Sequence, residues 1–306
     1  MISFVILTSG LAALILALLV SFALTASKLK VDLPPDNPER WLAVHGKPAD
    51  RPPRGRPIVV CAGDSITHGV VSADWVAMMR ARMPDAEFVN AGVNSELAWN
   101  LHQRLDPIVA IDPDFIVVLI GSNDANATLG FKSTIGYMAN QGLPELPSPS
   151  LFRETLTLIV RRLKTETSAA MALASIPPIF EEPDSHPWMR TAEYAGYVKD
   201  IAKAEDVGYL PFRERLVAYL ESAPRKRSIP YETFQKAIRR AMWDHRMLGK
   251  SWDEISAANG FHLLVDGIHL NTHGATVLAD LAEKFIRDGR RAARAGAPGA
   301  TVWPRW

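Results

Sequence analysis

A serine and a histidine that lie far apart in the chain are the first residues whose surroundings predict chemistry. Ser65 ends the run Gly63-Asp64-Ser65, between an apolar segment and a helical one. Its hydroxyl becomes a nucleophile only when a nearby base removes the proton. His269 can be that base, and Asp266, three residues earlier, can orient the imidazole through its other nitrogen. These residues predict nucleophilic catalysis, although a lone serine after a strand is more often a helix N-cap.

Donors for the negative charge of an attacked carbonyl come from two other short segments. Residues 121–124, Gly-Ser-Asn-Asp, follow an apolar run and offer the side-chain amide of Asn123. Gly92 follows another predicted strand and offers a backbone N–H with no side chain in the way. The backbone N–H of Ser65 lies near the positive end of a helix. Asn123 and Gly92 are therefore candidate oxyanion donors, although Gly92 and Gly121, each taken alone, are more readily turn residues.

Together these segments resemble the GDSL/SGNH hydrolase family, whose four sequence blocks are named for Ser, Gly, Asn and His and occur here in that order. The resemblance implies a carboxylic ester hydrolase with a flavodoxin-like fold and with no cofactor or metal. It implies that Ser65 attacks an acyl carbonyl and that His269, oriented by Asp266, acts as base and then as acid. It also implies that the N–H groups of Ser65 and Gly92 and the side-chain amide of Asn123 hold the oxyanion. It covers roughly residues 58–286. In two places the chain departs from the family: Ile66 replaces a common leucine, and residues 94–95 replace a frequent Ser-Gly pair.

Apolar strands and helical segments alternate from residue 58 onward. Continuous apolar strands are typical of a parallel sheet covered on both faces. We predict an α/β fold, a three-layer α/β/α sandwich with a central parallel sheet, whose ligand site lies at the carboxyl ends of the strands. The predicted strands are 58–62, 87–90, 115–120, 169–176 and 207–212, and the predicted helices are 75–83, 97–111 with an interruption at Pro107, 151–164 and 194–204, followed by a last helix capped by Asn271 or Thr272.

The predicted hydrolase domain spans residues 58–288 and contains two less regular segments. Residues 126–149 are rich in Gly, Pro and Asn and are predicted to form a long loop. Residues 222–261 are predicted to be a helical insertion, either a lid or extra scaffold helices. Residues 289–306, with several arginines among Ala, Gly and Pro, are predicted to be a disordered tail.

The N-terminal segment predicts attachment to a membrane. Residues 2–27 hold no charged side chain, and this uncharged stretch is long enough to cross a bilayer once. We therefore predict a single-pass anchor over residues 1–27 rather than a cleaved signal peptide. Lys28 and Lys30 follow the anchor, and this flanking charge favours a cytoplasmic catalytic domain. The proline-rich residues 31–57 are predicted to be a stiff, extended linker.

The charge balance and the histidine spacing limit the other functions. The 34 basic and 33 acidic residues nearly cancel, which argues against nucleic acid as a partner. His269 and His273 are spaced like helical zinc ligands, but a helix start at residue 271 or 272 separates them. The expected substrate is a small-molecule, glycan or lipid acyl ester, as for an esterase, lipase or carbohydrate deacetylase. An acyltransferase with the same acyl-enzyme and a non-catalytic membrane-tethered binding module remain the alternatives.

Overall fold

The computed structural model describes residues 32–47 and 55–294. The chain divides into a short unit, residues 1–33, and a compact unit, residues 34–306. The predicted membrane anchor, residues 1–27, lies outside the described residues. Within the described part of the chain, no helix combines the length and the apolar character that crossing a bilayer requires.

A five-stranded, fully parallel sheet forms the centre of the larger unit, as predicted. The strand order is β2-β1-β3-β4-β5, the arrangement of flavodoxin-like folds. The order reverses at β1, and in sheets of this type ligands bind at the carboxyl ends of the strands beside such a reversal. The strands are β1 (Ile58–Gly63), β2 (Glu87–Gly92), β3 (Phe115–Leu119), β4 (Ala170–Ala174) and β5 (Gly208–Leu210).

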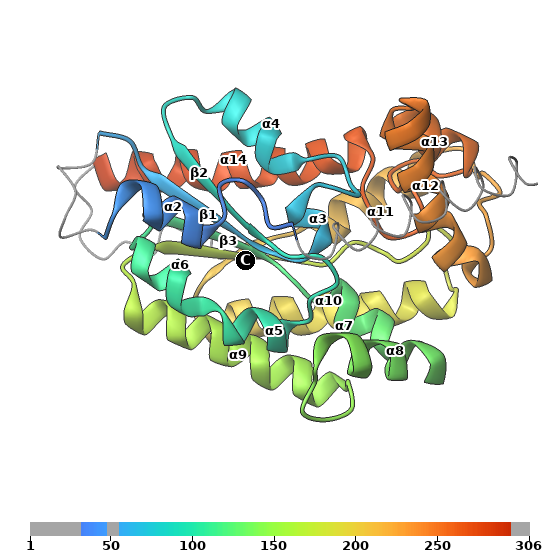
Figure 1. Ribbon diagram of the computed structural model, residues 1–306, viewed down its shortest axis with the longest axis horizontal. Helices are drawn as coiled ribbons and strands as arrows, with labels where there is room; N and C mark the ends of the chain where they lie inside the picture. Colours follow the sequence, from blue (N-terminus) through green and yellow to red (C-terminus); the bar gives the residue numbers. More distant parts are fainter. Residues whose placement is uncertain (1–31, 48–54, 295–306) are drawn as a thin grey trace, which may run out of the picture. The chain divides into compact units, whose positions relative to one another are not determined.

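Helices cover both faces of the sheet (Figure 1). Helices α4 and α14 pack together on one face, while α5, α6 and α10 pack with α9 on the other. The helices are α2 (Pro38–His45), α3 (Ser65–His68), α4 (Trp75–Arg82), α5 (Ala98–Gln103), α6 (Leu105–Ile111), α7 (Ser122–Ala127), α8 (Phe131–Gln141), α9 (Pro149–Glu166), α10 (His186–Ala204), α11 (Phe212–Ser222), the 3₁₀ turn η2 (Tyr231–Thr233), α12 (Phe234–Leu248), α13 (Trp252–Ala258) and α14 (Thr272–Arg294).

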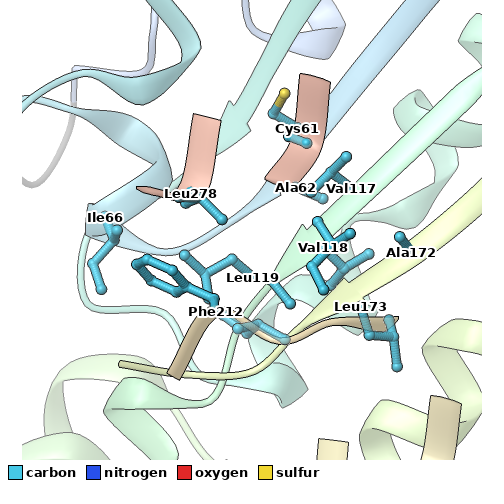
Figure 2. Packing of buried hydrophobic residues seen from close by; sticks show 14 of the residues in the cluster. Cys61, Ala62, Ile66, Val117, Val118, Leu119, Ala172, Leu173, Phe212 and Leu278 are labelled. Atoms are coloured by element: carbon cyan, nitrogen blue, oxygen red, sulfur yellow. The ribbon is translucent and has the colours of Figure 1, made fainter. Parts of the chain in front are cut away.

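The core explains why the strands are continuous apolar runs. Every residue of β1 and β3 is buried, because side chains on both faces of the sheet meet a helix layer. Figure 2 shows part of this core, with side chains of β1, β3 and β4 beside Ile66, Phe212 and Leu278. Cys61 of β1 is one of these packing residues, and burial raises the pKa of its thiol.

Two segments predicted to be irregular contain helices. Residues 126–149 include α8, which has no fully buried residue and therefore a weak apolar signal in the sequence. Side chains fix its first turn, since Ser133 Oγ and Thr134 Oγ1 donate to the carbonyls of Asn126 and Ala127. The predicted linker, residues 31–57, contains α2, capped by Asn37. The prediction of an extended linker is therefore wrong for residues 38–45.

Several helix boundaries also differ from the predictions. The break in residues 97–111 lies at Arg104, and Pro107 sits in the first turn of α6, where its missing N–H has no intrahelical partner to lose. Helix α10 begins at His186, because Ser185 caps it and Pro187 suits its first turn. Helix α14 continues to residue 294, so residues 289–294 of the predicted tail are helical.

Candidate active site

The nucleophile candidate lies where β1 passes into α3. Asp64 is the N-cap of α3 and accepts a hydrogen bond from the Ile66 N–H (2.9 Å). Ser65 is therefore the first residue of the helix, and the capping role belongs to its neighbour. Gly63 is needed just before this turn, since a Cβ there would lie 2.3 Å from the Leu119 carbonyl oxygen and 2.4 Å from Thr67 Oγ1.

The structure brings Ser65, His269 and Asp266 into one hydrogen-bonded chain. Ser65 Oγ lies 2.9 Å from His269 Nε2, and His269 Nδ1 lies 2.8 Å from Asp266 Oδ2. All three residues are buried. An ionised carboxylate only accepts hydrogen bonds, so Nδ1 carries the proton and Nε2 presents its lone pair to the serine hydroxyl. This is the tautomer that a general base for Ser65 requires.

The loop that carries Asp266 and His269 is folded around the Asp266 carboxylate. Its other oxygen, Oδ1, accepts the N–H groups of Ile268 and His269, each at 3.1 Å. Gly267 adopts φ 106°, a conformation that L-residues rarely adopt, and its Cα faces the ring of Phe180 so closely that a Cβ would lie 2.4 Å from Cε2. The Phe180 N–H donates to the Gly267 carbonyl (2.7 Å). The segment after β4 therefore holds this loop from one side.

Glu181 holds the same loop from its other end. Its carboxylate accepts three consecutive backbone N–H groups, from His262 (2.7 Å), Leu263 (2.7 Å) and Leu264 (2.8 Å). Burial raises the pKa of Glu181, while these N–H groups act in the opposite direction. A single side chain thus satisfies the backbone donors of the stretch that leads to Asp266.

A further set of hydrogen bonds joins the loop that carries His269 to the segment after α3. The Ala73 N–H donates to the Leu270 carbonyl (2.8 Å), and the Leu270 N–H donates to Ser72 Oγ (3.0 Å). Ser72 Oγ also donates to the Leu270 carbonyl (3.3 Å). Leu270 directly follows His269, so the segment after Ser65 and the residue after His269 form one hydrogen-bonded unit.

Asn123 lies in the first turn of α7, after β3, and is buried. Its Nδ2 donates to the Glu96 carbonyl (2.9 Å), and its Oδ1 accepts the hydroxyl of Tyr137 (2.6 Å). Arg104 braces the same region: it pairs with the Glu96 carboxylate (2.7 Å) and donates to the Gly63 carbonyl (3.2 Å). Asn123 is thereby connected, through Glu96 and Arg104, to the end of β1 from which Ser65 emerges.

Gly92 lies at the end of β2, next to the end of β1. Its N–H donates to Asn90 Oδ1 (2.9 Å), so a role as an oxyanion donor would require this bond to break. Close packing explains the glycine, because a Cβ there would lie 2.2 Å from the backbone nitrogen of His68. Ser95, in the following turn, has φ 64°, an uncommon value for a residue with a side chain.

Two buried carboxyl groups beside these residues have perturbed acidity. Burial raises the pKa of Asp64 to about 7, and it also raises that of Asp124 to about 7. Asp124 accepts the Ala98 N–H at the start of α5. Asp64 Oδ2 has no hydrogen-bond partner, so no donor at that oxygen offsets the burial that raises the pKa. Across residues 32–47 and 55–294, no group of three His, Cys, Asp or Glu side chains is arranged to hold a metal.

Comparison with known families agrees with this geometry. Residues 61–277 match the model of the GDSL-like Lipase/Acylhydrolase family. The chain belongs to this family. It is thus a GDSL/SGNH carboxylic ester hydrolase, as the four blocks predicted, and its α/β fold with a parallel sheet is the one that the resemblance implied.

Solved structures share the fold of this GDSL hydrolase at low sequence identity. They include the acetyl xylan esterase AlAXEase (17% identity, TM-score 0.52, covering 74% of this chain and 98% of that one). The acetylxylan esterase Axe2 from Geobacillus stearothermophilus is also similar (17% identity, TM-score 0.53, covering 75% of this chain and 94% of that one). So is LAE5, an α/β hydrolase from the metagenome of Lake Arreo, Spain (19% identity, TM-score 0.51, covering 75% of this chain and 94% of that one). No curated protein matches the chain significantly.

The sequence did not indicate the residues that hold the predicted site residues in place. Glu181 contacts a segment 81 to 83 residues further along the chain, and Tyr137 lies in a stretch predicted to be a loop. Neither belongs to a recognisable motif. Glu96 and Arg104 are eight residues apart, about 12 Å along a continuous helix and too far for an ion pair, so only the folded loop brings them together.

Proposed function

We propose that this GDSL hydrolase cleaves a carboxylic ester through an acyl-enzyme on Ser65, with His269 and Asp266 as its catalytic partners. The observation that carries the proposal is the unbroken chain from Ser65 Oγ to His269 Nε2 (2.9 Å) and from His269 Nδ1 to Asp266 (2.8 Å). The family match over residues 61–277 supports the same chemistry.

In the acylation step, Ser65 Oγ attacks the acyl carbonyl carbon while His269 Nε2 takes the hydroxyl proton. The carbonyl π electrons move to oxygen and form a tetrahedral oxyanion. Asp266 stabilises the imidazolium that results, since its carboxylate accepts the Nδ1 hydrogen. Collapse of the intermediate breaks the bond to the alcohol, which leaves with the proton from His269.

In the deacylation step, water replaces the alcohol. His269 removes a proton from the water, which attacks the acyl-enzyme carbonyl, and the carboxylic acid leaves as Ser65 recovers its proton. An alcohol acceptor in place of water would give acyl transfer by the same two steps. Adding a second alcohol to the assay and measuring the transesterified product separates hydrolysis from transfer.

The oxyanion donors in this proposal are the Ser65 N–H and the Asn123 amide. Asn123 uses one Nδ2 hydrogen for the Glu96 carbonyl and retains a second for the substrate. The predicted third donor, Gly92, stays a prediction, because its N–H is bonded to Asn90. Loss of one such donor typically lowers the rate by about 10²–10³.

The acyl group that we propose first is acetyl, carried by a carbohydrate. Two of the similar solved structures are acetylxylan esterases, and this likeness motivates the substrate panel. A series of p-nitrophenyl esters of increasing chain length distinguishes a small-acyl esterase, which we expect, from an enzyme that prefers long acyl chains. Acetylated oligosaccharides test the alcohol side.

The decisive experiment compares the wild-type chain with Ser65→Ala and with Ser150→Ala, an exposed serine on α9. We expect wild type and Ser150→Ala to hydrolyse p-nitrophenyl acetate equally and Ser65→Ala to lose nearly all activity. A serine-directed phosphonate should label wild type at Ser65 alone. Equal hydrolysis by wild type and Ser65→Ala, or labelling elsewhere, would contradict the proposal.

Membrane attachment through residues 1–27, with the catalytic domain in the cytoplasm, is part of the same proposal. The support is the uncharged stretch 2–27 and the lysines that follow it. We expect the full chain to fractionate with membranes and a chain starting at residue 31 not to. Cys61 is the single cysteine and is buried, so a cysteine engineered after residue 306 reports orientation alone. Labelling of intact cells by an impermeant thiol reagent would contradict the cytoplasmic orientation.

A further inference from the structure

A chain of side-chain hydrogen bonds ends on the amide of Asn123. The Tyr231 hydroxyl donates to Asn126 Oδ1 (3.1 Å), Asn126 Nδ2 donates to Tyr137 Oη (3.1 Å), and the Tyr137 hydroxyl donates to Asn123 Oδ1 (2.6 Å). The three bonds run in one direction, and the bond to Asn123 is the shortest. None of Tyr231, Asn126 and Tyr137 was singled out by the sequence as a site residue.

The direction of the chain fixes each hydrogen. Asn126 Nδ2 can only donate, so Tyr137 Oη accepts there and its own hydrogen points to Asn123. Asn123 Oδ1 is therefore an acceptor, and its Nδ2 lies on the opposite side, where one hydrogen meets the Glu96 carbonyl at 2.9 Å. Rotation of the amide by 180° would place Nδ2 against the Tyr137 hydrogen and Oδ1 against the Glu96 carbonyl oxygen.

The same chain also changes the strength of the donor. Hydrogen bonds in series polarise one another, and an amide whose oxygen accepts a strong bond has more acidic N–H groups. Burial raises the pKa of Tyr137, so its hydroxyl stays protonated and donates throughout the range of an esterase assay.

We propose that Tyr137 is a positioning residue. It holds the Asn123 amide so that the second Nδ2 hydrogen points to the acyl carbonyl, where the oxyanion forms. Tyr231 supports it from the other end of the chain. The inference rests on the proposed function, since it needs an oxyanion at this amide. It assigns a role to α8 and η2, which lie between the four sequence blocks.

The test is a double-mutant cycle between Tyr137→Phe and Asn123→Ala with p-nitrophenyl acetate. Phenylalanine keeps the ring and removes only the hydroxyl. We expect Tyr137→Phe to lower kcat by about 3- to 10-fold, with KM within a factor of two. Asn123→Ala should lower kcat by about 10²–10³. In the Asn123→Ala background, Tyr137→Phe should cause no further loss, because the group through which it acts is absent.

Two more variants make the cycle specific. Tyr197→Phe on α10 is the matched control, because its hydroxyl bonds to the exposed Glu193 (2.6 Å), and it should leave kcat unchanged. Tyr231→Phe should lower kcat by less than Tyr137→Phe and again only when Asn123 is present. It provides the test if Tyr137→Phe fails to fold.

Two results would overturn the inference: an unchanged kcat in Tyr137→Phe, or an equal loss in both backgrounds, which would mark a general structural effect. Failure of the proposed function gives a different result, because Ser65→Ala would then keep the wild-type rate whatever the Tyr137 variants do.

Discussion

The contact between Glu181 and the loop before Asp266 allows a quantitative prediction. Glu181→Ala leaves three backbone N–H groups without their acceptor. Leu263 and Leu264 are 0% exposed, whereas His262 can reach water. An unsatisfied buried donor costs about 1–3 kcal/mol, so two of them cost about 2–6 kcal/mol. Water that enters the space left by the carboxylate can accept one of these hydrogens, so we expect the free energy of unfolding to fall by about 2–4 kcal/mol, the lower half of that range.

The amide variant gives an intermediate expectation. In Glu181→Gln, one oxygen can still accept both Leu263 and Leu264, which now share Oε1, while the new NH₂ group faces His262. The loss should be about 1 kcal/mol. Because the loop carries Asp266 and His269, kcat should follow the same order as stability: highest in wild type, lower in Glu181→Gln and lowest in Glu181→Ala. KM should change little.

Urea unfolding and p-nitrophenyl acetate kinetics measure these effects on the same preparations. Glu182→Ala, at the exposed neighbouring position, is the control and should stay within about 0.5 kcal/mol of wild type. The reasoning is refuted if Glu181→Ala is no less stable than Glu182→Ala. A stable Glu181→Ala with normal kcat would show that Phe180, Asp266 and the bonds to Ser72 and Ala73 position the loop without Glu181.

Three other outcomes follow from the structure. The pKa of Asp124 is raised to about 7 in the native state, above the unfolded value of about 3.9, so the contribution of this group to the free energy of unfolding is largest at low pH and is lost as pH rises through about 7. Asp124→Asn should therefore lose less free energy of unfolding between pH 5 and pH 8 than wild type, and an equal loss would argue against the assignment. Gly267→Ala should lose about 2–6 kcal/mol in urea unfolding from its φ of 106° and the clash with Phe180, whereas Gly142→Ala, with φ 60° and open space, should lose about 1–3. Trp41→Ala removes a ring that is 4% exposed and should cost about 3–5 kcal/mol with normal kcat in the folded fraction, whereas an unaffected Tm would mean that α2 is not part of the domain.

The sequence was informative where one local pattern determines the structure. The strands β1 and β3 are runs buried on both faces, so their composition alone identifies them. The predicted site residues Ser65 and Asn123 lie in the first turns of the helices that follow β1 and β3, whereas Asp266 lies in the loop before α14. Parallel strands place such loops at one edge of the sheet, and the order of the blocks was therefore sufficient to predict that they meet.

The sequence was uninformative where tertiary contacts decide the structure. Helix α8 contains one glycine, Gly136, and no fully buried residue, so its composition predicts a helix only weakly. Its first turn is set instead by Ser133 and Thr134, whose hydroxyls donate to carbonyls of the preceding helix. The engagement of Gly92 by Asn90 depends on a side-chain rotamer, which no spacing rule predicts. The role of Glu181 could not be predicted from the sequence, because its hydrogen-bond partners lie 81 to 83 residues further along the chain.

The bonds between Ser72, Ala73 and Leu270 have a consequence for how the protein opens. They connect the segment after Ser65 to the residue after His269, although these lie 198 residues apart. A local fluctuation that withdraws His269 must also break the bonds that Leu270 makes to Ser72 and Ala73. The backbone N–H groups of Ala73 and Leu270 should therefore exchange with deuterium at similar rates. Loss of activity on heating should therefore coincide with loss of exchange protection at both Ala73 and Leu270, not at one of them alone.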